Sequence, residues 1–189
     1  MLRHLPNLIT ALRIALIVPL CRLIDDGRYE GALLVAAIAG FSDALDGFLA
    51  KRFGWQSWIG GMLDPIADKL LLMAAFVWLA LAGDLPAWLA AVVVGRDVAI
   101  VAGAIAYHNL VGRFDAAPSA LSKITTVMQI GFVLTELVRL SRWIEISSPT
   151  RALLIAITAA STIASGLHYM VVWGLRARRA VAARRENTQ

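Results

Sequence analysis

The sequence contains few charged residues and a single cysteine. Only 16% of its 189 residues are charged, whereas a soluble domain carries about a quarter. Hydrophobic residues make up 59% of the chain, and its mean hydropathy is +0.72. This composition excludes an ordinary soluble domain and predicts one integral membrane domain. The lone Cys21 excludes an internal disulfide, and its apolar surroundings predict a buried small hydrophobe.

Histidine is also scarce, and the basic residues form no nucleic-acid surface. His4, His108 and His168 stand far apart in the sequence, so none is expected to bind a metal. The net charge of +5 comes from Lys and Arg residues spread among apolar segments and gathered near the C-terminus. This distribution favours a role in membrane topology over nucleic-acid binding.

Six apolar stretches are long enough to cross a hydrocarbon core, which needs about 20 helical residues. They run approximately over Pro6–Ile24, Tyr29–Lys51, Gly61–Ala82, Pro86–Tyr107, Ser119–Leu140 and Arg151–Leu175. Short breaks with Gly, Pro and charged residues separate them, and none is long enough for a soluble domain. We therefore predict an all-α polytopic membrane protein with six transmembrane helices, comprising a membrane domain over residues 1–175 and a basic cytoplasmic tail over 176–189.

Lys and Arg residues are concentrated on one side of this layout. Arg3, the pair Lys51 and Arg52, the segment 113–123 and the C-terminal tail share that side, which the positive-inside rule makes cytoplasmic. An inner (cytoplasmic) membrane location is expected. A cleaved signal peptide is the alternative for the first segment, but Arg13 interrupts its apolar run and no small-residue cleavage site follows.

Four aspartates lie within the apolar part of the chain, at the predicted cytoplasmic end of the second and third helices. Asp43 and Asp46 are three residues apart, and Asp64 and Asp68 are four apart, so each pair shares one helix face. A short hairpin over residues 53–59 would bring the two faces together. Carboxylates at membrane depth are costly unless paired or coordinated. The cluster therefore predicts a cytoplasm-facing polar cavity that holds Mg²⁺ or Mn²⁺, with room for two ions.

Small residues flank the aspartates. Gly47, Ala50 and Gly60 leave little side-chain bulk there, so that a charged ligand can approach the backbone. Close helix packing is the alternative explanation. Asp64 has a second interpretation as a helix N-cap, because Pro65 suits the first turn of a helix.

The complete pattern resembles a known family signature. The chain reads Asp43-x2-Asp46-Gly47-x2-Ala50-Lys51-x8-Gly60-x3-Asp64-x3-Asp68, which is similar to the D-x2-D-G-x2-A-R-x8-G-x3-D-x3-D motif of the CDP-alcohol phosphatidyltransferases. A weaker similarity extends from the PNLIT-x2-R opening at Pro6 to Lys123. Lys51 stands where the family usually has arginine. Lysine keeps the charge but lacks the planar two-pronged donor.

The resemblance implies transfer of a phosphatidyl group from CDP-diacylglycerol to an alcohol, with release of CMP. It implies that all four aspartates bind two divalent cations and that Asp68 also serves as the general base, although Asp68 could be a metal ligand only. Residues implied to contact the CDP-lipid are Asp46, Gly47, Ala50, Lys51 and Gly60, together with Asn7, Thr10 and Arg13 in the first helix. Membrane dimers are typical of this family, so a homodimer is a further expectation.

The acceptor alcohol is open between two choices. Phosphatidylglycerophosphate synthases, which use glycerol 3-phosphate, commonly have Glu after the basic residue of the fourth helix and Arg eight residues beyond it. This chain has Asp97 after Arg96, and Ala104 at the later position. The segments from Gly95 and Pro118 look more like the CMP-forming cardiolipin synthases, so we favour phosphatidylglycerol. Arg96 and Lys123 are the candidate ligands for the acceptor phosphate, with an Arg96–Asp97 or Arg96–Asp68 ion pair and a snorkelling Lys123 as structural alternatives.

Two other classes of membrane protein use intramembrane carboxylates. A cation transporter would need polar residues across the membrane, but the far halves of the second and third segments are apolar. A membrane prenyltransferase usually carries two Asp-rich motifs on a larger bundle. Both remain remote alternatives.

Overall fold

The computed structural model describes the backbone of residues 5–53, 58–111 and 120–186, and the side chains of residues 10–42, 66–105 and 120–174. All regular structure in these ranges is helical. The helices are α1 (Leu5–Asp25), α2 (Tyr29–Phe53), α3 (Trp58–Leu81), α4 (Ala87–Val111), α5 (Ala120–Leu140) and α6 (Ser148–Glu186). The all-α prediction is confirmed, and most helix boundaries agree with the predicted segments within a few residues.

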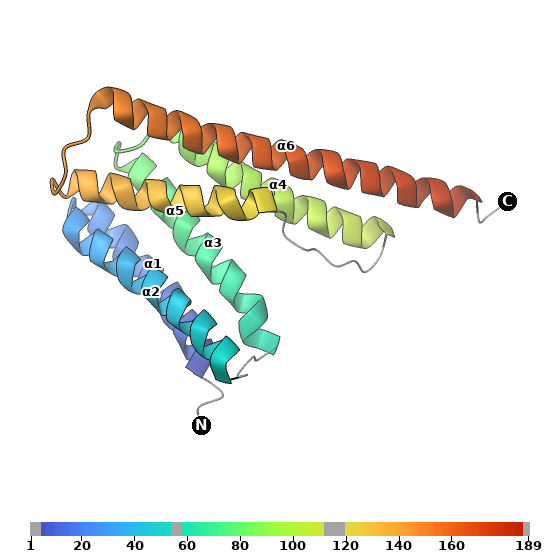
Figure 1. Cartoon of the computed structure of the whole chain (residues 1–189), viewed down its shortest axis with the longest axis horizontal. Coiled ribbons are helices and arrows are strands. Elements are labelled where there is room, and N and C mark those ends of the chain that lie inside the picture. The colour runs from blue at the N-terminus through green and yellow to red at the C-terminus, as the bar shows by residue number, and fades with distance from the viewer. Residues whose placement is uncertain (1–4, 54–57, 112–119, 187–189) are drawn as a thin grey trace.

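The helices fan out in two groups from one end of the molecule. The turns α1–α2, α3–α4 and α5–α6 lie together at this end, on the left of Figure 1, and we call it the turn end. From there α1, α2 and α3 run in one direction, while α4, α5 and α6 run in another. The C-terminal part of α2 and the N-terminal part of α3, which carry the four aspartates, therefore lie away from the turn end.

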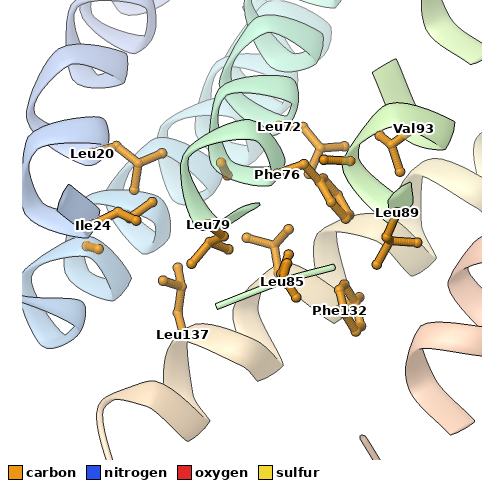
Figure 2. Packing of buried hydrophobic residues seen from close by; sticks show 14 of the residues in the cluster. Leu20, Ile24, Leu72, Phe76, Leu79, Leu85, Leu89, Val93, Phe132 and Leu137 are labelled. Carbon is orange, nitrogen blue, oxygen red and sulfur yellow. The ribbon is translucent and has the colours of Figure 1, made fainter. Parts of the chain in front are cut away.

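The apolar core lies close to the turn end. Leu20 and Ile24 of α1, Phe76 and Leu79 of α3, and Leu137 of α5 are almost fully buried there, as Figure 2 shows. The rings of Phe76 and Phe132 stack with centroids 6.0 Å apart, which joins α3 to α5. In a bilayer such contacts stabilise the bundle by van der Waals packing, because lipid tails are as apolar as the side chains.

The distribution of polarity is that of a membrane protein. Large apolar side chains such as Val101, Val127 and Leu153 are more than half exposed, while Arg13, Gln129 and Glu136 are buried. Within the described residues, three helices are long and apolar enough to cross a membrane, over Ala87–Ile105, Ala120–Leu140 and Ser148–Gly174. The apolar stretch described in α2, Tyr29–Ser42, is shorter. The six-span count stays a prediction.

Two helix boundaries differ from the sequence-based expectation. α3 begins at Trp58, so Asp64 lies inside a helix, and its interpretation as an N-cap is wrong. α6 continues without a break to Glu186, so the expected division at residue 175 falls inside a 39-residue helix. Arginine and alanine are good helix formers, which explains why the basic segment extends the helix.

Candidate active site

The aspartate motif occupies the ends of α2 and α3 that the four-residue link 54–57 joins. Asp43 and Asp46 lie in α2, and Asp64 and Asp68 lie in α3. The side chains of the first three, and those of Gly47, Ala50, Lys51, Gly60 and Asn7, lie outside the described residues. The predicted convergence of four carboxylates thus stays a prediction. Among the side chains that are described, no group of three His, Cys, Asp or Glu residues forms a metal site.

Asp68 is held by a buried arginine from α1. Arg13 Nη1 donates to Asp68 Oδ1 at 2.5 Å. The Arg13 side chain is 1% exposed, whereas that of Asp68 is 41% exposed. Thr10, one turn before Arg13, is also buried. The arginine therefore fixes the carboxylate from the protein side, while the carboxylate itself remains accessible to a ligand.

The next residue of α3 makes an ion pair in another direction. Lys69 Nζ donates to Asp97 Oδ1 of α4 at 3.0 Å. Asp68 and Lys69, which are consecutive in α3, thus form ion pairs with α1 and α4 respectively. Together these two contacts set the rotation of α3 about its axis. Since Asp68 depends on that rotation for its direction, the Lys69–Asp97 pair helps to position it.

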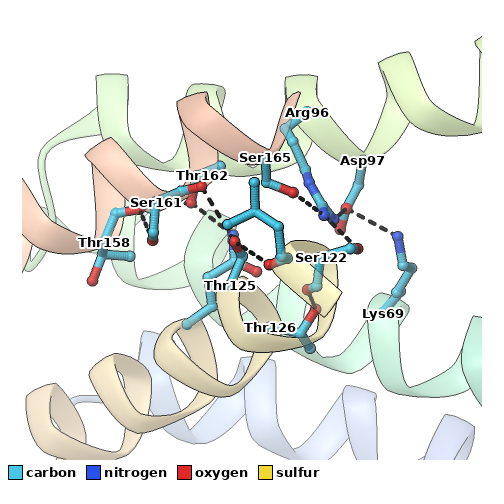
Figure 3. Close-up of polar contacts among 12 residues, drawn as sticks. Lys69, Arg96, Asp97, Ser122, Thr125, Thr126, Thr158, Ser161, Thr162 and Ser165 are labelled. Carbon is cyan, nitrogen blue, oxygen red and sulfur yellow. Dashed lines mark hydrogen bonds and ion pairs between the residues drawn. The ribbon is translucent and has the colours of Figure 1, made fainter. Parts of the chain in front are cut away.

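Arg96 lies at the centre of a buried polar cluster between α4, α5 and α6. Its Nη1 donates to Asp97 Oδ1 at 2.5 Å, and its Nη2 donates to Ser122 Oγ at 2.6 Å and Ser165 Oγ at 2.7 Å. Figure 3 shows these side chains converging on the guanidinium. The Arg96 side chain is 3% exposed, and only its Nε lacks a hydrogen-bond partner among the described residues.

These contacts bear on the predicted acceptor ligands. The Arg96–Asp97 ion pair, considered from the sequence as a structural alternative, is present. To bind Arg96, an acceptor phosphate would have to accept a hydrogen bond from the buried Arg96 Nε, or displace Asp97 or the serines from the guanidinium. Lys123 is exposed on α5, which is compatible with both snorkelling and ligand binding.

Sequence reasoning missed Lys69, Ser122 and Ser165. Lys69 follows Asp68 directly and is a charged residue within an apolar helix, which is a usable signal. The two serines gave no signal, because serine is common at helix interfaces in membranes. Their importance comes from their position against Arg96.

The chain matches the CDP-alcohol phosphatidyltransferase family over residues 3–164. It is 33% identical over 149 residues to the human cardiolipin synthase (CMP-forming), covering 70% of this chain and 50% of the relative. It is 31% identical over 183 residues to the chloroplastic CDP-diacylglycerol--glycerol-3-phosphate 3-phosphatidyltransferase 1 of Oryza sativa subsp. japonica, covering 88% of this chain and 56% of the relative.

A third relative, the CDP-diacylglycerol--glycerol-3-phosphate 3-phosphatidyltransferase of Pseudomonas fluorescens, is 42% identical over 106 residues, covering 52% of this chain and 53% of the relative. The chain thus spans about half the length of these curated relatives. With a match that extends over most of its length and includes the aspartate motif, the chain belongs to the CDP-alcohol phosphatidyltransferase family.

Proposed function

We propose that the protein transfers the phosphatidyl group of CDP-diacylglycerol to the hydroxyl of an alcohol and releases CMP. The observation that carries this proposal is the Arg13–Asp68 pair. The last carboxylate of the family motif is 41% exposed and is oriented by a buried guanidinium. Family membership supports the donor and the reaction class.

Two divalent cations, Mg²⁺ or Mn²⁺, fit the donor set. Asp43, Asp46, Asp64 and Asp68 supply the hard oxygen ligands that these ions prefer, and Asp64 has no capping role to fulfil because it lies inside α3. When bound, the ions would neutralise the diphosphate of the donor. The neighbouring Gly47, Ala50, Lys51 and Gly60, with Asn7 and Thr10 from α1, are proposed to line the CDP-lipid site.

Asp68 is the proposed general base. It would accept the proton of the acceptor hydroxyl as the oxygen of that hydroxyl forms a bond to the phosphorus of the phosphatidyl group and the bond to CMP breaks. A base must reach the proton within a hydrogen bond, directly or through one water. The exposed carboxylate allows that approach, and Arg13 holds it in a fixed direction. We therefore assign Arg13 a positioning role beside its predicted contact with the CDP-lipid.

The acceptor proposed first is phosphatidylglycerol. Arg96 is already engaged by Asp97 and two serines, and Lys69 by Asp97. Asp97 supplies one negative charge to two cations, so this group of side chains keeps a net charge of about +1. A single positive charge suits a singly charged phosphodiester better than a dianionic phosphate monoester. The human relative has the corresponding name. Glycerol 3-phosphate is the second candidate, because the rice and Pseudomonas relatives are named for it.

Lys69 is the further acceptor contact that we propose. Its side chain is 35% exposed and directly follows Asp68 in the sequence. In both candidate acceptors a three-carbon glycerol unit separates the reacting hydroxyl from a phosphate. A hydroxyl at Asp68 would therefore bring that phosphate within reach of a neighbouring cation. Arg96 would support this contact through Asp97, which the two cations share.

The experiment supplies the purified protein with CDP-diacylglycerol and Mg²⁺ or Mn²⁺. Phosphatidylglycerol, glycerol 3-phosphate, inositol phosphate and serine are then offered separately. CMP release with phosphatidylglycerol and a product of cardiolipin mass is the expected result. CMP release with none of the four alcohols would refute the proposed activity, and a phosphatidylglycerophosphate product would establish the second candidate.

The Asp68→Asn variant tests the role of the base. Asparagine keeps the size of the side chain but cannot accept the proton, so turnover should fall by at least about a hundredfold. Binding of CDP-diacylglycerol should be largely retained. A variant that turns over at the wild-type rate would show that Asp68 is not the base.

The protein is proposed to act in the inner membrane, with the aspartate-bearing helix ends facing the cytoplasm. The concentration of Lys and Arg on that side of the predicted layout supports this orientation. A homodimer is proposed from the family resemblance alone.

A further inference from the structure

A polar cavity lies at the turn end, far along α2 from the aspartate motif. Its volume is about 360 Å³. It lies between the α1–α2 turn and the end of α5 and is lined by Gly27, Arg28, Tyr29, Glu30, Gly31, Leu140, Ser141 and Arg142. The catalytic proposal uses none of these residues.

Two arginines give this cavity a positive charge. Arg28 and Arg142 are both exposed, and among the described residues neither guanidinium makes a hydrogen bond or an ion pair. Glu30 is the acidic residue of the lining, and it accepts a hydrogen bond from Trp143 Nε1 at 3.2 Å. Asp25 and Asp26 precede Gly27 but do not line the cavity. The lining therefore has a net charge of about +1.

The backbone at Arg142 shows that this arginine occupies an unusual position. α1, α3 and α5 all end at the turn end with the same pair of backbone hydrogen bonds. In α5, the N–H of Arg142 donates to the carbonyl of Arg139, three residues earlier, and the N–H of Trp143 donates to the carbonyl of Val138, five residues earlier. This motif needs a left-handed residue, usually glycine. Gly27 and Gly83 fill it in α1 and α3, with φ of 67° and 82°, whereas α5 uses Arg142, with φ of 59°.

The backbone preference at position 142 does not explain why it is an arginine, and the membrane topology explains neither Arg28 nor Arg142. Glycine is the residue that suits the left-handed position, and α1 and α3 have it. The positive-inside rule predicts few basic residues at this end, which is opposite to the predicted cytoplasmic side. An anionic ligand that both guanidiniums contact would explain why arginine is found at each position.

We propose that this cavity binds the phosphate headgroup of an anionic phospholipid in the leaflet at the turn end. A lipid is the favoured source of the phosphate because the cavity adjoins the end of a membrane-capable helix, where the boundary of a bilayer is expected. It is lined by Leu140, the last residue of the membrane-capable helix α5. Next to it, Trp143 is 65% and Ile144 is 59% exposed, as expected of side chains that contact the interfacial region.

The test measures binding of phosphatidic acid and phosphatidylcholine to the full-length protein in a neutral detergent, by native mass spectrometry. Phosphatidic acid is chosen because it is neither of the proposed acceptors. The wild type should prefer phosphatidic acid. Arg28→Gln and Arg142→Gln should each weaken its binding by about tenfold, the effect of losing a hydrogen bond to a charged group.

Arg142→Gly separates ligand binding from folding. Glycine suits the left-handed backbone, so this variant should unfold at a higher temperature than the wild type without lipid and should still lose the preference for phosphatidic acid. Arg22→Gln is the matched control, because Arg22 is an exposed arginine near the end of α1 that does not line the cavity. It should bind phosphatidic acid as the wild type does.

Three results would overturn the proposal. Arg142→Gly could retain the full preference for phosphatidic acid, which would place the lipid elsewhere, including at the catalytic site. Arg22→Gln could lose as much binding as the cavity variants, which would show a general charge effect. Inorganic phosphate could compete at the same concentration as phosphatidic acid, which would assign the cavity to a soluble anion.

Discussion

Asp97 of α4 accepts contacts from two cations through one oxygen atom: Arg96 of its own helix, and Lys69 of α3, which directly follows Asp68. Arg96 Nη1 lies 2.5 Å and Lys69 Nζ 3.0 Å from Asp97 Oδ1. Arg96 has almost no exposure, so it depends on Asp97 and the two serines for compensation of its charge. At the scale of single residues, Asp97 thus supports both the stability of the bundle and the direction of its neighbours.

Replacing Asp97 with Asn should destabilise the protein by about 3–5 kcal/mol, because a buried charge is left without its counter-ion. Ser165→Ala should cost less, about 1.5–3 kcal/mol, since it removes one hydrogen bond to a charged group. Unfolding in detergent micelles provides the measurement. Ser161→Ala is the control, because the Ser161 hydroxyl donates to a backbone carbonyl of its own helix and has no other hydrogen-bond partner among the described residues. Equal effects of the three substitutions would contradict this account.

Lys69→Gln should raise the KM for the acceptor by about tenfold and leave the KM for CDP-diacylglycerol nearly unchanged, as expected for a lost charged contact with the acceptor phosphate. Steady-state kinetics with each substrate varied in turn provides the measurement. Lys69→Arg keeps the charge and should recover part of the loss. A purely structural Lys69 would instead change both KM values or only the stability.

At the scale of secondary-structure elements, polar side chains join α5 to α6. A row of polar side chains follows the interface, where Thr125 Oγ1 donates to the Ser161 carbonyl and Gln129 Nε2 donates to Thr162 Oγ1. Near the turn end the row reaches Glu136, which is 1% exposed. Arg139, three residues further along α5, makes an ion pair with Glu136 at 2.8 Å. Arg151 of α6 makes a second ion pair with it, at 3.0 Å.

The ion-paired cluster of Glu136, Arg139 and Arg151 is also connected to neighbouring elements. Arg151 Nη2 donates to the backbone carbonyl of Asp84 in the α3–α4 turn, and the Asp84 carboxylate accepts a hydrogen bond from Tyr29 of α2. Glu136→Gln should therefore destabilise the bundle by about 3 kcal/mol, without a direct effect on the acceptor KM. The exposed Glu145→Gln should stay within about 0.5 kcal/mol of wild type. Thermal unfolding in detergent distinguishes the two variants. Similar stabilities of Glu136→Gln and Glu145→Gln would contradict a stabilising role of this cluster.

At the scale of the whole molecule, six crossings would place the three turns of the turn end on one side of the membrane. In a Cys21→Ser background, single cysteines at Asp26, Ala82 and Ser147 should react with a membrane-impermeant maleimide from one side. A cysteine at Ala116 should react only from the other side. Labelling of Asp26 and Ser147 positions from opposite sides would refute the six-span arrangement.

Much of the architecture follows from local hydropathy. An apolar run of about 20 residues must satisfy its backbone within the bilayer, so helix positions can be read along the chain without knowledge of their neighbours. The start of α3 was harder to predict, because the Asp64-Pro65 sequence also suits a helix N-cap. The continuation of α6 was missed since its basic segment is polar while being a good helix former.

The sequence by itself determined the helical membrane character, the family and the residues of the aspartate motif, because composition and spacing are local properties. Only the tertiary structure decided which buried charges meet. Arg13 pairs with Asp68 although 55 residues separate them, and Arg96 is enclosed by Asp97, Ser122 and Ser165. Such partners depend on how each helix is rotated and packed against the others, and no pattern along the chain specifies that rotation.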